Sequence, residues 1–409
     1  MEYPGENYNE SKVPPYSLPD PLVCADGTPV TDPGTWLSKR RPELLGMFEE
    51  YMYGKTPPAQ IETRFELLER SGSAFEGTAE RRQVVARFSR SGRTEEMDIL
   101  LYLPTRSPRP VGLFAGLNFH GNHAISIDPG VRLPRSYVRN SEITGVTDNR
   151  ASDASRGTTA GKWDIPQILR RGYGLATAYC GDLDPDFDDG FINGIHPLFY
   201  REGQARPDAN EWGAIGAWAW GLSRIMDYIQ TDPDLDEHRV AVMGHSRLGK
   251  TALWASAQDP RFAITVSVNS GCGGAALSRR LFGETVETLI RMMPFWFCRN
   301  FRGYANREND LPIDQHMLIS LIAPRPVYVA SAEDDPRADP KGEFLAARHA
   351  DPVYRLLGTD GIASYDMPGI HEPITSTIGY HIRSGKHAVT PYDWEHLLNF
   401  ADRHMPPGV

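Results

Sequence analysis

The chain has 409 residues, of which 40% are hydrophobic and 23% are charged, the composition of a globular protein with a large core. Its formal net charge is -10 and no long basic run offsets this acidity, which argues against a nucleic acid partner. No stretch of about 18 consecutive apolar residues is present, so the sequence predicts no membrane-spanning helix.

The first 35 residues are polar and proline-rich, and we expect them to form an extended arm on the surface. No basic segment followed by an apolar core is present there, so no signal peptide is visible, and a removed signal would leave the same sequence. The four cysteines, Cys24, Cys180, Cys272 and Cys298, have no metal-type spacing and permit a disulfide without indicating one. We expect Cys180 and Cys272 to be buried thiols, and we expect no metal or other cofactor.

The following segments divide into a β-rich part and an alternating part. A short helix is predicted over 40–52, followed by strands over 61–68, 83–88 and 96–103 that Gly/Ser turns separate. From about residue 110, apolar runs alternate with helical stretches, which indicates βαβ units and a parallel sheet. The runs are 111–119, 174–180, 240–243, 263–268 and 327–331.

Two helices are predicted within the alternating part. Over 211–230, six apolar side chains fall on one stripe at helical spacing, namely Trp212, Ile215, Leu222, Ile225, Met226 and Ile229. We interpret this stripe as core packing and not as a cofactor site. A last helix is predicted over 392–404, close to the end of the chain.

One turn has the pattern of an activated serine. It reads Gly244-His245-Ser246-Arg247-Leu248-Gly249. The turn lies between a buried strand and a helix, which is the context of the nucleophile elbow of α/β-hydrolases. There the backbone N–H of Arg247 would face the developing oxyanion. The second glycine lies one position later than in G-x-S-x-G. The alternative is that Ser246 is an ordinary helix N-cap, which does not explain the two glycines.

A serine hydroxyl needs a base and an acid, which follow it in chain order in this fold. The loop after the run 327–331 offers Glu333, Asp334 and Asp335 as candidate acids. We choose Asp335 because it lies furthest into the loop. The other two could equally be solvated carboxylates or helix caps.

The base is expected in the loop before the last helix. His387 lies there, in Gly385-Lys386-His387-Ala388. His381 and His371 are its competitors, and the loop position favours His387.

The sequence around the serine resembles the signature G-C/H-S-R-x-G-K of the glucuronoyl esterases, carbohydrate esterase family 15, in its bacterial form. The resemblance covers most of residues 110–404. It includes 244–250 (GHSRLGK), 270–280 (SGCGGAALSRR), 283–285 (GET), 311–316 (LPIDQH), 322–326 (IAPRP), 342–344 (GEF) and 385–388 (GKHA).

The resemblance implies a metal-free serine esterase. Members cleave the ester between the carboxyl group of 4-O-methyl-glucuronic acid on xylan and a lignin alcohol. It further implies that Ser246 is the nucleophile and His387 the base, and that the Arg247 side chain supports the oxyanion. It implies that Lys250 contacts sugar hydroxyls and that Glu284 lies in the same pocket. Arg247 and Lys250 lie at i and i+3, so a helix would place both on one face.

Two positions depart from the family pattern. Fungal members carry the acid just before Ser-Gly-x-Gly-Gly, where this chain has Asn269, which cannot supply a carboxylate. The acid is therefore expected in the later loop, as in many bacterial members, which favours Asp335. Members often carry a tryptophan two residues after that acid, and its ring stacks on the sugar. This chain has Arg337 there, so we place Arg337 with Lys250 and Glu284 as a candidate substrate-binding residue.

We therefore predict one α/β-hydrolase domain over 1–409, a three-layer sandwich with a mostly parallel sheet. An N-terminal arm and β-rich extension covers 1–105 and the catalytic core covers 106–409. The expected activity is hydrolysis of glucuronate esters that join xylan to lignin alcohols, by a monomer without nucleic acid or membrane partners. The family implies a secreted or periplasmic location. The alternatives are another carbohydrate esterase, such as an acetyl xylan esterase, or a catalytically silent relative that binds acidic glycans.

Overall fold

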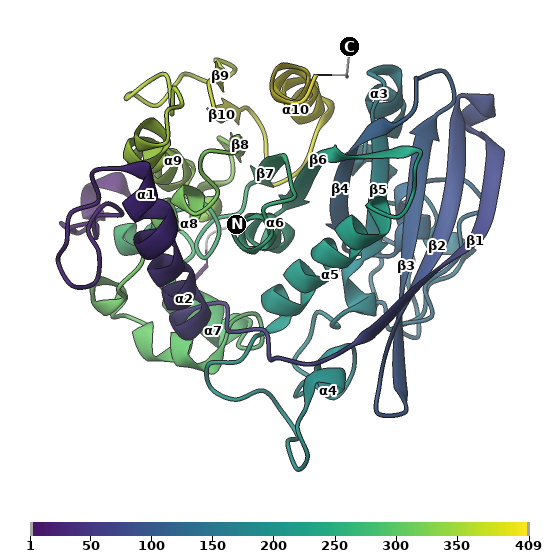
Figure 1. Ribbon diagram of the computed structural model, residues 1–409, viewed down its shortest axis with the longest axis horizontal. Helices are drawn as coiled ribbons and strands as arrows, with labels where there is room; N and C mark the ends of the chain where they lie inside the picture. Colours follow the sequence, from purple (N-terminus) through teal and green to yellow (C-terminus); the bar gives the residue numbers. More distant parts are fainter. Residues whose placement is uncertain (1–2, 407–409) are drawn as a thin grey trace.

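A computed structural model describes residues 3–406, and its framework is one 10-stranded sheet (Figure 1). The strand order is β1-β2-β3-β5-β4-β6-β7-β8-β10-β9. The strands are β1 (Glu62–Ala74), β2 (Ala79–Arg90), β3 (Arg93–Pro104), β4 (Val111–Asn118), β5 (Gly174–Tyr179), β6 (Leu235–His245), β7 (Ile264–Val268), β8 (Val327–Ala332), β9 (Ile374–Thr375) and β10 (Ile378–Arg383). Six adjacent strands pair in parallel, namely β5, β4, β6, β7, β8 and β10, whereas β1, β2, β3 and β9 pair antiparallel.

The helices cover both faces of this sheet (Figure 1). They are α1 (Pro33–Thr35), α2 (Arg41–Tyr51), α3 (Ile165–Arg170), α4 (His196–Phe199), α5 (Ala214–Ile229), α6 (Arg247–Gln258), α7 (Val286–Met292), α8 (Gln315–Ser320), α9 (Pro340–Leu356) and α10 (Pro391–His404). Within residues 3–406, no helix is both long enough and apolar enough to cross a membrane.

Side chains that alternate along the central strands build two separate cores. In β6, Val240 and Val242 pack with α5, α6 and α9, whereas Ala241 and Met243 pack with α3 and α10. Because successive strand residues point to opposite faces, strands buried on both sides read as continuous apolar runs. The result is the three-layer α/β-hydrolase sandwich that the sequence predicts, and the fold class is confirmed.

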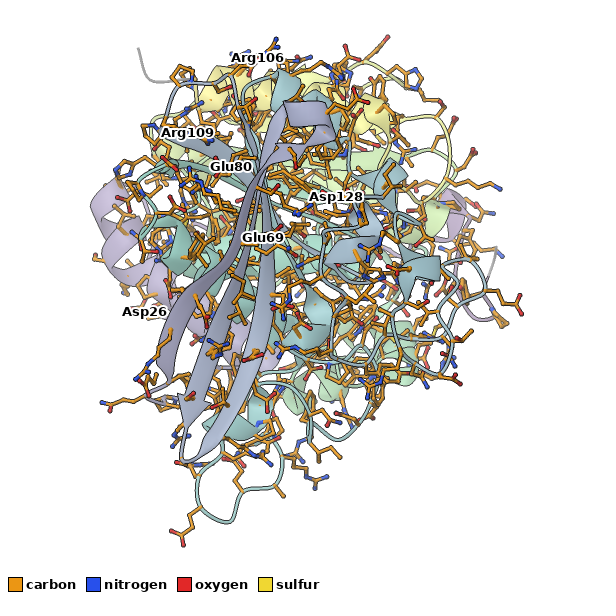
Figure 2. All side chains as sticks on the ribbon, turned by 90° about the vertical axis from the view of Figure 1, so that its right-hand side faces the viewer. Asp26, Glu69, Glu80, Arg106, Arg109 and Asp128 are labelled. Carbon is orange, nitrogen blue, oxygen red and sulfur yellow. The ribbon has the colours of Figure 1, made fainter. Side chains whose placement is uncertain are left out.

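The strands β1–β3 continue the same sheet and carry many charges. Arg81 on β2 forms ion pairs with Glu69 and Asp128, and its neighbour Arg82 pairs with Asp232 across 2.6 Å. Figure 2 shows this end of the molecule, with Glu69 and Asp128 among the labelled side chains. Charged residues on the outer strands discourage pairing with another chain. The division of the chain at residue 105 stays a prediction.

Several boundaries differ from the sequence-based expectation. The strands β1–β3 are longer than predicted, and α5 begins at Ala214 and not at residue 211. Trp212 lies before this helix, where its backbone N–H donates to the carbonyl of Lys55. The sequence reading also missed β10, whose residues 378–383 are buried and pair in parallel with β8. Its mixture of glycine, histidine and arginine hides a strand that packs on both faces.

Candidate active site

Ser246 lies in the sharp turn between β6 and α6. Its backbone has φ 58° and ψ −132°, a left-handed φ that a residue with a side chain rarely adopts. A Cβ at Gly244 would come within 1.9 Å of the Leu248 carbonyl oxygen, and one at Gly249 would meet the Ser270 Cβ at 3.0 Å. In the part of the chain that the structure describes, the Ser246 side chain makes no capping hydrogen bond. The turn is therefore built around close backbone approach, and an N-cap does not account for it.

His387 and Asp335 meet above this turn. His387 Nδ1 lies 2.6 Å from Asp335 Oδ2. The Asp335 side chain is 9% exposed and that of His387 is 43% exposed, so one side of the imidazole faces solvent. Glu333 and Asp334 are both exposed, and within residues 3–406 neither forms a hydrogen bond or ion pair with this histidine. Of the three candidate acids, the structure places only Asp335 beside His387.

The two competing histidines have other surroundings. His381 is fully buried on β10, where its Nδ1 meets the Tyr328 hydroxyl and its Nε2 meets Asp393, each over 2.9 Å. His371 is exposed and its Nε2 lies 3.1 Å from the Ser384 hydroxyl. His381 therefore serves the packing between β8, β10 and α10.

His245 connects the serine turn to the base. Its ring lies against the His387 ring, with 4.4 Å between centroids. Burial, followed by the charges of His387 and Lys162, holds the pKa of His245 well below its ordinary value. Since His245 directly precedes Ser246, this contact places the serine turn beside His387. Between the described atoms no hydrogen bond joins the Ser246 hydroxyl to His387, and such bonds often tighten only when substrate binds.

The Arg247 guanidinium is held by contacts with Asp186, Phe119 and Trp296. Its Nη2 lies 2.5 Å from Asp186 Oδ2, and the group stacks over the rings of Phe119 and Trp296, 4.4 and 5.6 Å from their centroids. Trp296 also donates its Nε1–H to Asp186 over 3.0 Å. The sequence reading missed Asp186, Phe119 and Trp296. Only the first two had a signal, because they lie in the loops that follow β5 and β4.

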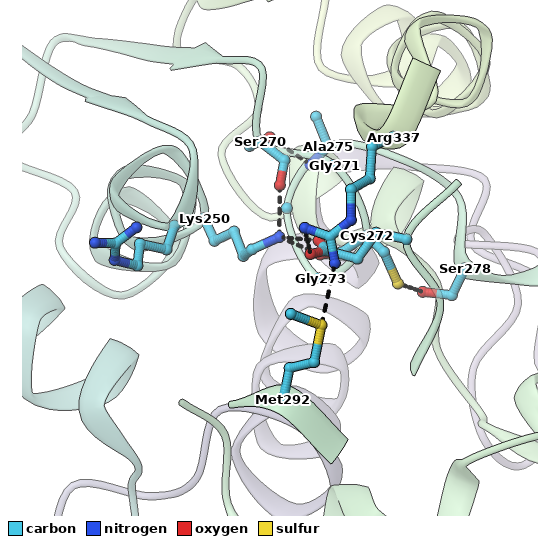
Figure 3. Close-up of polar contacts among 12 residues, drawn as sticks. Lys250, Ser270, Gly271, Cys272, Gly273, Ala275, Ser278, Met292 and Arg337 are labelled. Atoms are coloured by element: carbon cyan, nitrogen blue, oxygen red, sulfur yellow. Dashed lines mark hydrogen bonds and ion pairs between the residues drawn. The ribbon is translucent and has the colours of Figure 1, made fainter. Parts of the chain in front are cut away.

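Lys250 lies on α6, one turn beyond Arg247, and it is buried. Its ammonium donates to the Ser270 carbonyl over 2.7 Å and to the Cys272 carbonyl (Figure 3). It also donates to Glu284 Oε2 over 2.9 Å. These contacts occupy its three N–H groups. Lys250 is only 2% exposed, whereas the Arg247 side chain is 24% exposed.

Arg337 and Glu284 meet beside Lys250. Arg337 Nη1 lies 3.3 Å from Glu284 Oε1, while the other carboxylate oxygen pairs with Lys250. The backbone N–H of Glu284 also donates to the Arg337 carbonyl over 2.9 Å. The structure thus brings together all three residues that the sequence assigns to substrate binding.

Among residues 3–406, no group of three or more His, Cys, Asp or Glu side chains is arranged to hold a metal ion. The four cysteines are all free and buried, as expected for Cys180 and Cys272. Burial raises the pKa of Cys298 to about 11, so it stays a thiol at neutral pH.

Known proteins resemble both the sequence and the fold. A family model for glucuronyl esterases of fungi matches residues 205–358. A carbohydrate esterase from an unknown prokaryotic organism is 52% identical over 99% of this chain and 93% of its own length. A 4-O-methyl-glucuronoyl methylesterase from Schizophyllum commune is 28% identical over 87% of this chain and 77% of its own length.

Solved structures agree with these sequence matches. A promiscuous CE15 esterase from a marine bacterial metagenome superposes with a TM-score of 0.92, covering 98% of this chain and 100% of that one, at 52% identity. The glucuronoyl esterase of Solibacter usitatus gives a TM-score of 0.91 at 46% identity, covering 97% of this chain and 100% of that one.

Proposed function

The chain belongs to carbohydrate esterase family 15, the glucuronoyl esterases, and from this premise we propose that it hydrolyses esters of glucuronic acid through Ser246, His387 and Asp335. The observation that carries the proposal is the 2.6 Å contact between Asp335 and His387 beside the strained serine turn. A base oriented by a buried carboxylate next to a half-buried serine is the arrangement that activates a hydroxyl for acyl transfer.

The reaction proceeds in two halves. The Ser246 hydroxyl oxygen attacks the ester carbonyl carbon while His387 Nε2 takes its proton, and Asp335 holds the other ring nitrogen and stabilises the imidazolium. His387 returns the proton to the leaving alcohol as the carbon–oxygen bond breaks, which leaves an acyl-serine. Water then attacks this ester while His387 takes its proton, and His387 returns that proton to the Ser246 oxygen as the acyl–serine bond breaks and glucuronate is released.

The oxyanion forms next to the start of α6. The backbone N–H of Arg247 is the first of that helix and has no partner within it. Its guanidinium, oriented by Asp186, adds positive charge to the same side. The sugar side of the site is formed by Lys250, Glu284 and Arg337. A glucuronate ring makes contacts with this side that a small acyl group leaves unmade.

The natural substrate we propose is a xylan glucuronate esterified to a lignin alcohol, and the enzyme acts as a monomer without nucleic acid or membrane partners. Because such a substrate is an extracellular polymer, we place the enzyme in a secreted or periplasmic location. The name of the Schizophyllum commune relative, a 4-O-methyl-glucuronoyl methylesterase, supports the sugar part of this assignment.

The experiment compares kcat/KM for benzyl glucuronate with kcat/KM for an aryl acetate on the same preparation. We expect the glucuronate ester to be the better substrate. A preference for acetate would favour an acetyl esterase, and binding of acidic xylan fragments without turnover would favour a silent binding protein.

A further inference from the structure

The sugar side of the site continues as a row of alternating charges that ends on the N-terminal arm. Lys250 contacts Glu284, Glu284 contacts Arg337, and Arg337 Nε lies 3.2 Å from Glu6 Oε1. The Glu6 side chain is 0% exposed, although it lies only a few residues from the start of the chain. A carboxylate is rarely buried unless it is paired, so this contact is a built feature and not a surface encounter.

The arm contacts the same guanidinium a second time. The Tyr3 ring lies under Arg337, with 4.2 Å between the guanidinium carbon and the ring centroid. Arg337 Nη2 also approaches the Met292 sulfur at 3.6 Å (Figure 3). The charges of Glu284 and Glu6 hold the pKa of Arg337 above its ordinary value, although burial lowers it.

Further contacts anchor the arm to both segments that carry the sugar-side residues. The N–H of Gly283, which precedes Glu284, donates to the Asn7 carbonyl over 2.7 Å. Glu10 pairs with Arg280 over 2.8 Å and with Lys341 over 2.7 Å. The arm therefore joins the segment before α7 to the start of α9, on either side of Arg337.

An arginine side chain loses considerable rotamer freedom when it binds a ligand, unless it is already fixed. In this protein Glu6, Tyr3 and Glu284 fix the guanidinium before substrate arrives. The side chain remains 26% exposed, and only part of its five N–H donors are used by the chain. A guanidinium held in this way presents directed donors that suit hydroxyl oxygens on a sugar.

We propose that Glu6 and Tyr3 are positioning residues that hold Arg337 as a hydrogen-bond donor to the hydroxyls of the uronate ring. The N-terminal arm thereby forms part of the substrate pocket and contributes to selectivity for uronate esters over small acyl esters. This inference rests on the proposed function, because it assigns the sugar to the side of the site that carries Glu284.

The test is a double-mutant cycle of Glu6→Gln and Arg337→Met, with kcat/KM measured for methyl glucuronate and for an aryl acetate. We expect Glu6→Gln to lower kcat/KM about fivefold for the glucuronate ester, through KM, because one charged contact that orients the donor is lost. Acetate hydrolysis should change less than about twofold, and the effect of Glu6→Gln should disappear when Arg337 is already Met. Lys12→Gln is the matched control, since Lys12 is an exposed residue of the same arm.

Equal losses on both substrates, or an undiminished effect of Glu6→Gln in the Arg337→Met background, would overturn the proposal. Tyr3→Leu supplies a second variant and should act in the same direction. A binding measurement separates this inference from the proposed reaction: methyl glucuronate is titrated into Ser246→Ala with and without Glu6→Gln. Weaker binding in Glu6→Gln that depends on Arg337 supports the positioning role of the arm, even if the wild type hydrolyses no glucuronate. Glucuronate hydrolysis that Glu6→Gln leaves unchanged refutes this role and leaves the proposed function intact.

Discussion

The side-chain amide of Asn269 donates a hydrogen bond to Oδ2 of Asp335 over 3.1 Å. Oδ2 is also the oxygen that contacts His387, so the amide supports the carboxylate at the atom that orients the base. Asn269 stands where the fungal pattern has an acid, and here the position serves as a hydrogen-bond donor to an acid from another loop. This relationship explains how an asparagine can stand at the fungal acid position beside an intact His–Asp pair.

Removing Asp335 tests this arrangement. We expect Asp335→Ala to lower kcat about a thousandfold, because the imidazole loses its orienting partner and the charge that stabilises the imidazolium. Asn269→Ala should lower it less than about tenfold, since the carboxylate remains and loses only one hydrogen bond. Asp334→Ala is the matched control, an exposed carboxylate one residue away. A near-normal rate in Asp335→Ala together with a loss in Asp334→Ala would mean that the acid has been assigned to the wrong residue.

Asp186 is expected to act through Arg247. Asp186→Asn keeps an oxygen for the Trp296 indole but removes the charge that holds the guanidinium. We expect kcat to fall about tenfold, less than for loss of a direct oxyanion donor. Asp188→Asn, an exposed residue of the same loop, should leave kcat unchanged. A rise in KM alone would show that Asp186 binds substrate and does not support the oxyanion.

Lys250 is expected to stabilise the fold as well as the site. Lys250→Met leaves two buried carbonyls and part of Glu284 without a donor, which should lower the free energy of unfolding by about 3 kcal/mol. Denaturant unfolding gives this value directly. Lys39→Met removes an exposed lysine paired with Asp26 and should leave stability unchanged. A fully stable Lys250→Met with lower glucuronate activity would restrict Lys250 to substrate binding.

Glu343 is expected to make stability depend on pH. It accepts hydrogen bonds from the N–H groups of Ser270 and Gly271 and from the Ser331 hydroxyl, and burial raises its pKa from 4.5 to about 8. The folded protein therefore holds this proton more tightly than the unfolded chain does. Its contribution to stability is complete below the unfolded pKa and is lost as the pH rises through the folded pKa.

The melting temperature of Glu343→Gln should consequently decline less than that of the wild type between about pH 5 and pH 8. Glutamine can keep the two backbone contacts through its carbonyl oxygen. Glu333→Gln, at an exposed carboxylate, should follow the wild-type curve. Parallel curves for Glu343→Gln and wild type would show that Glu343 binds the same number of protons in both states.

The parts that the sequence predicts well are those with strong local patterns. Continuous apolar runs indicate the central strands, and the glycines around Ser246 indicate close backbone approach, which Gly244 shows directly. Asp335 is chosen because it lies in the loop after β8, and His387 because it lies in the loop before α10. These are places that the topology of a parallel sheet brings to one edge.

The parts that it does not predict depend on contacts between distant segments. The loop position of Asp186 after β5 is a signal, but nothing in the sequence indicates that Trp296, 110 residues away along the chain, meets it at Arg247. Glu6 lies 331 residues from Arg337 and has no motif around it. The burial of Lys250 is equally hidden in the sequence, since two of its three acceptors are backbone carbonyls, which any residue type supplies.

The most direct test of the account is the hydrolysis of benzyl glucuronate by Ser246→Ala, with the melting temperature measured on the same preparation. We expect kcat to fall at least about a thousandfold while the melting temperature stays within a few degrees of the wild-type value, because the nucleophile is lost and the turn is retained. A folded Ser246→Ala variant that keeps more than about a hundredth of the wild-type turnover would contradict it.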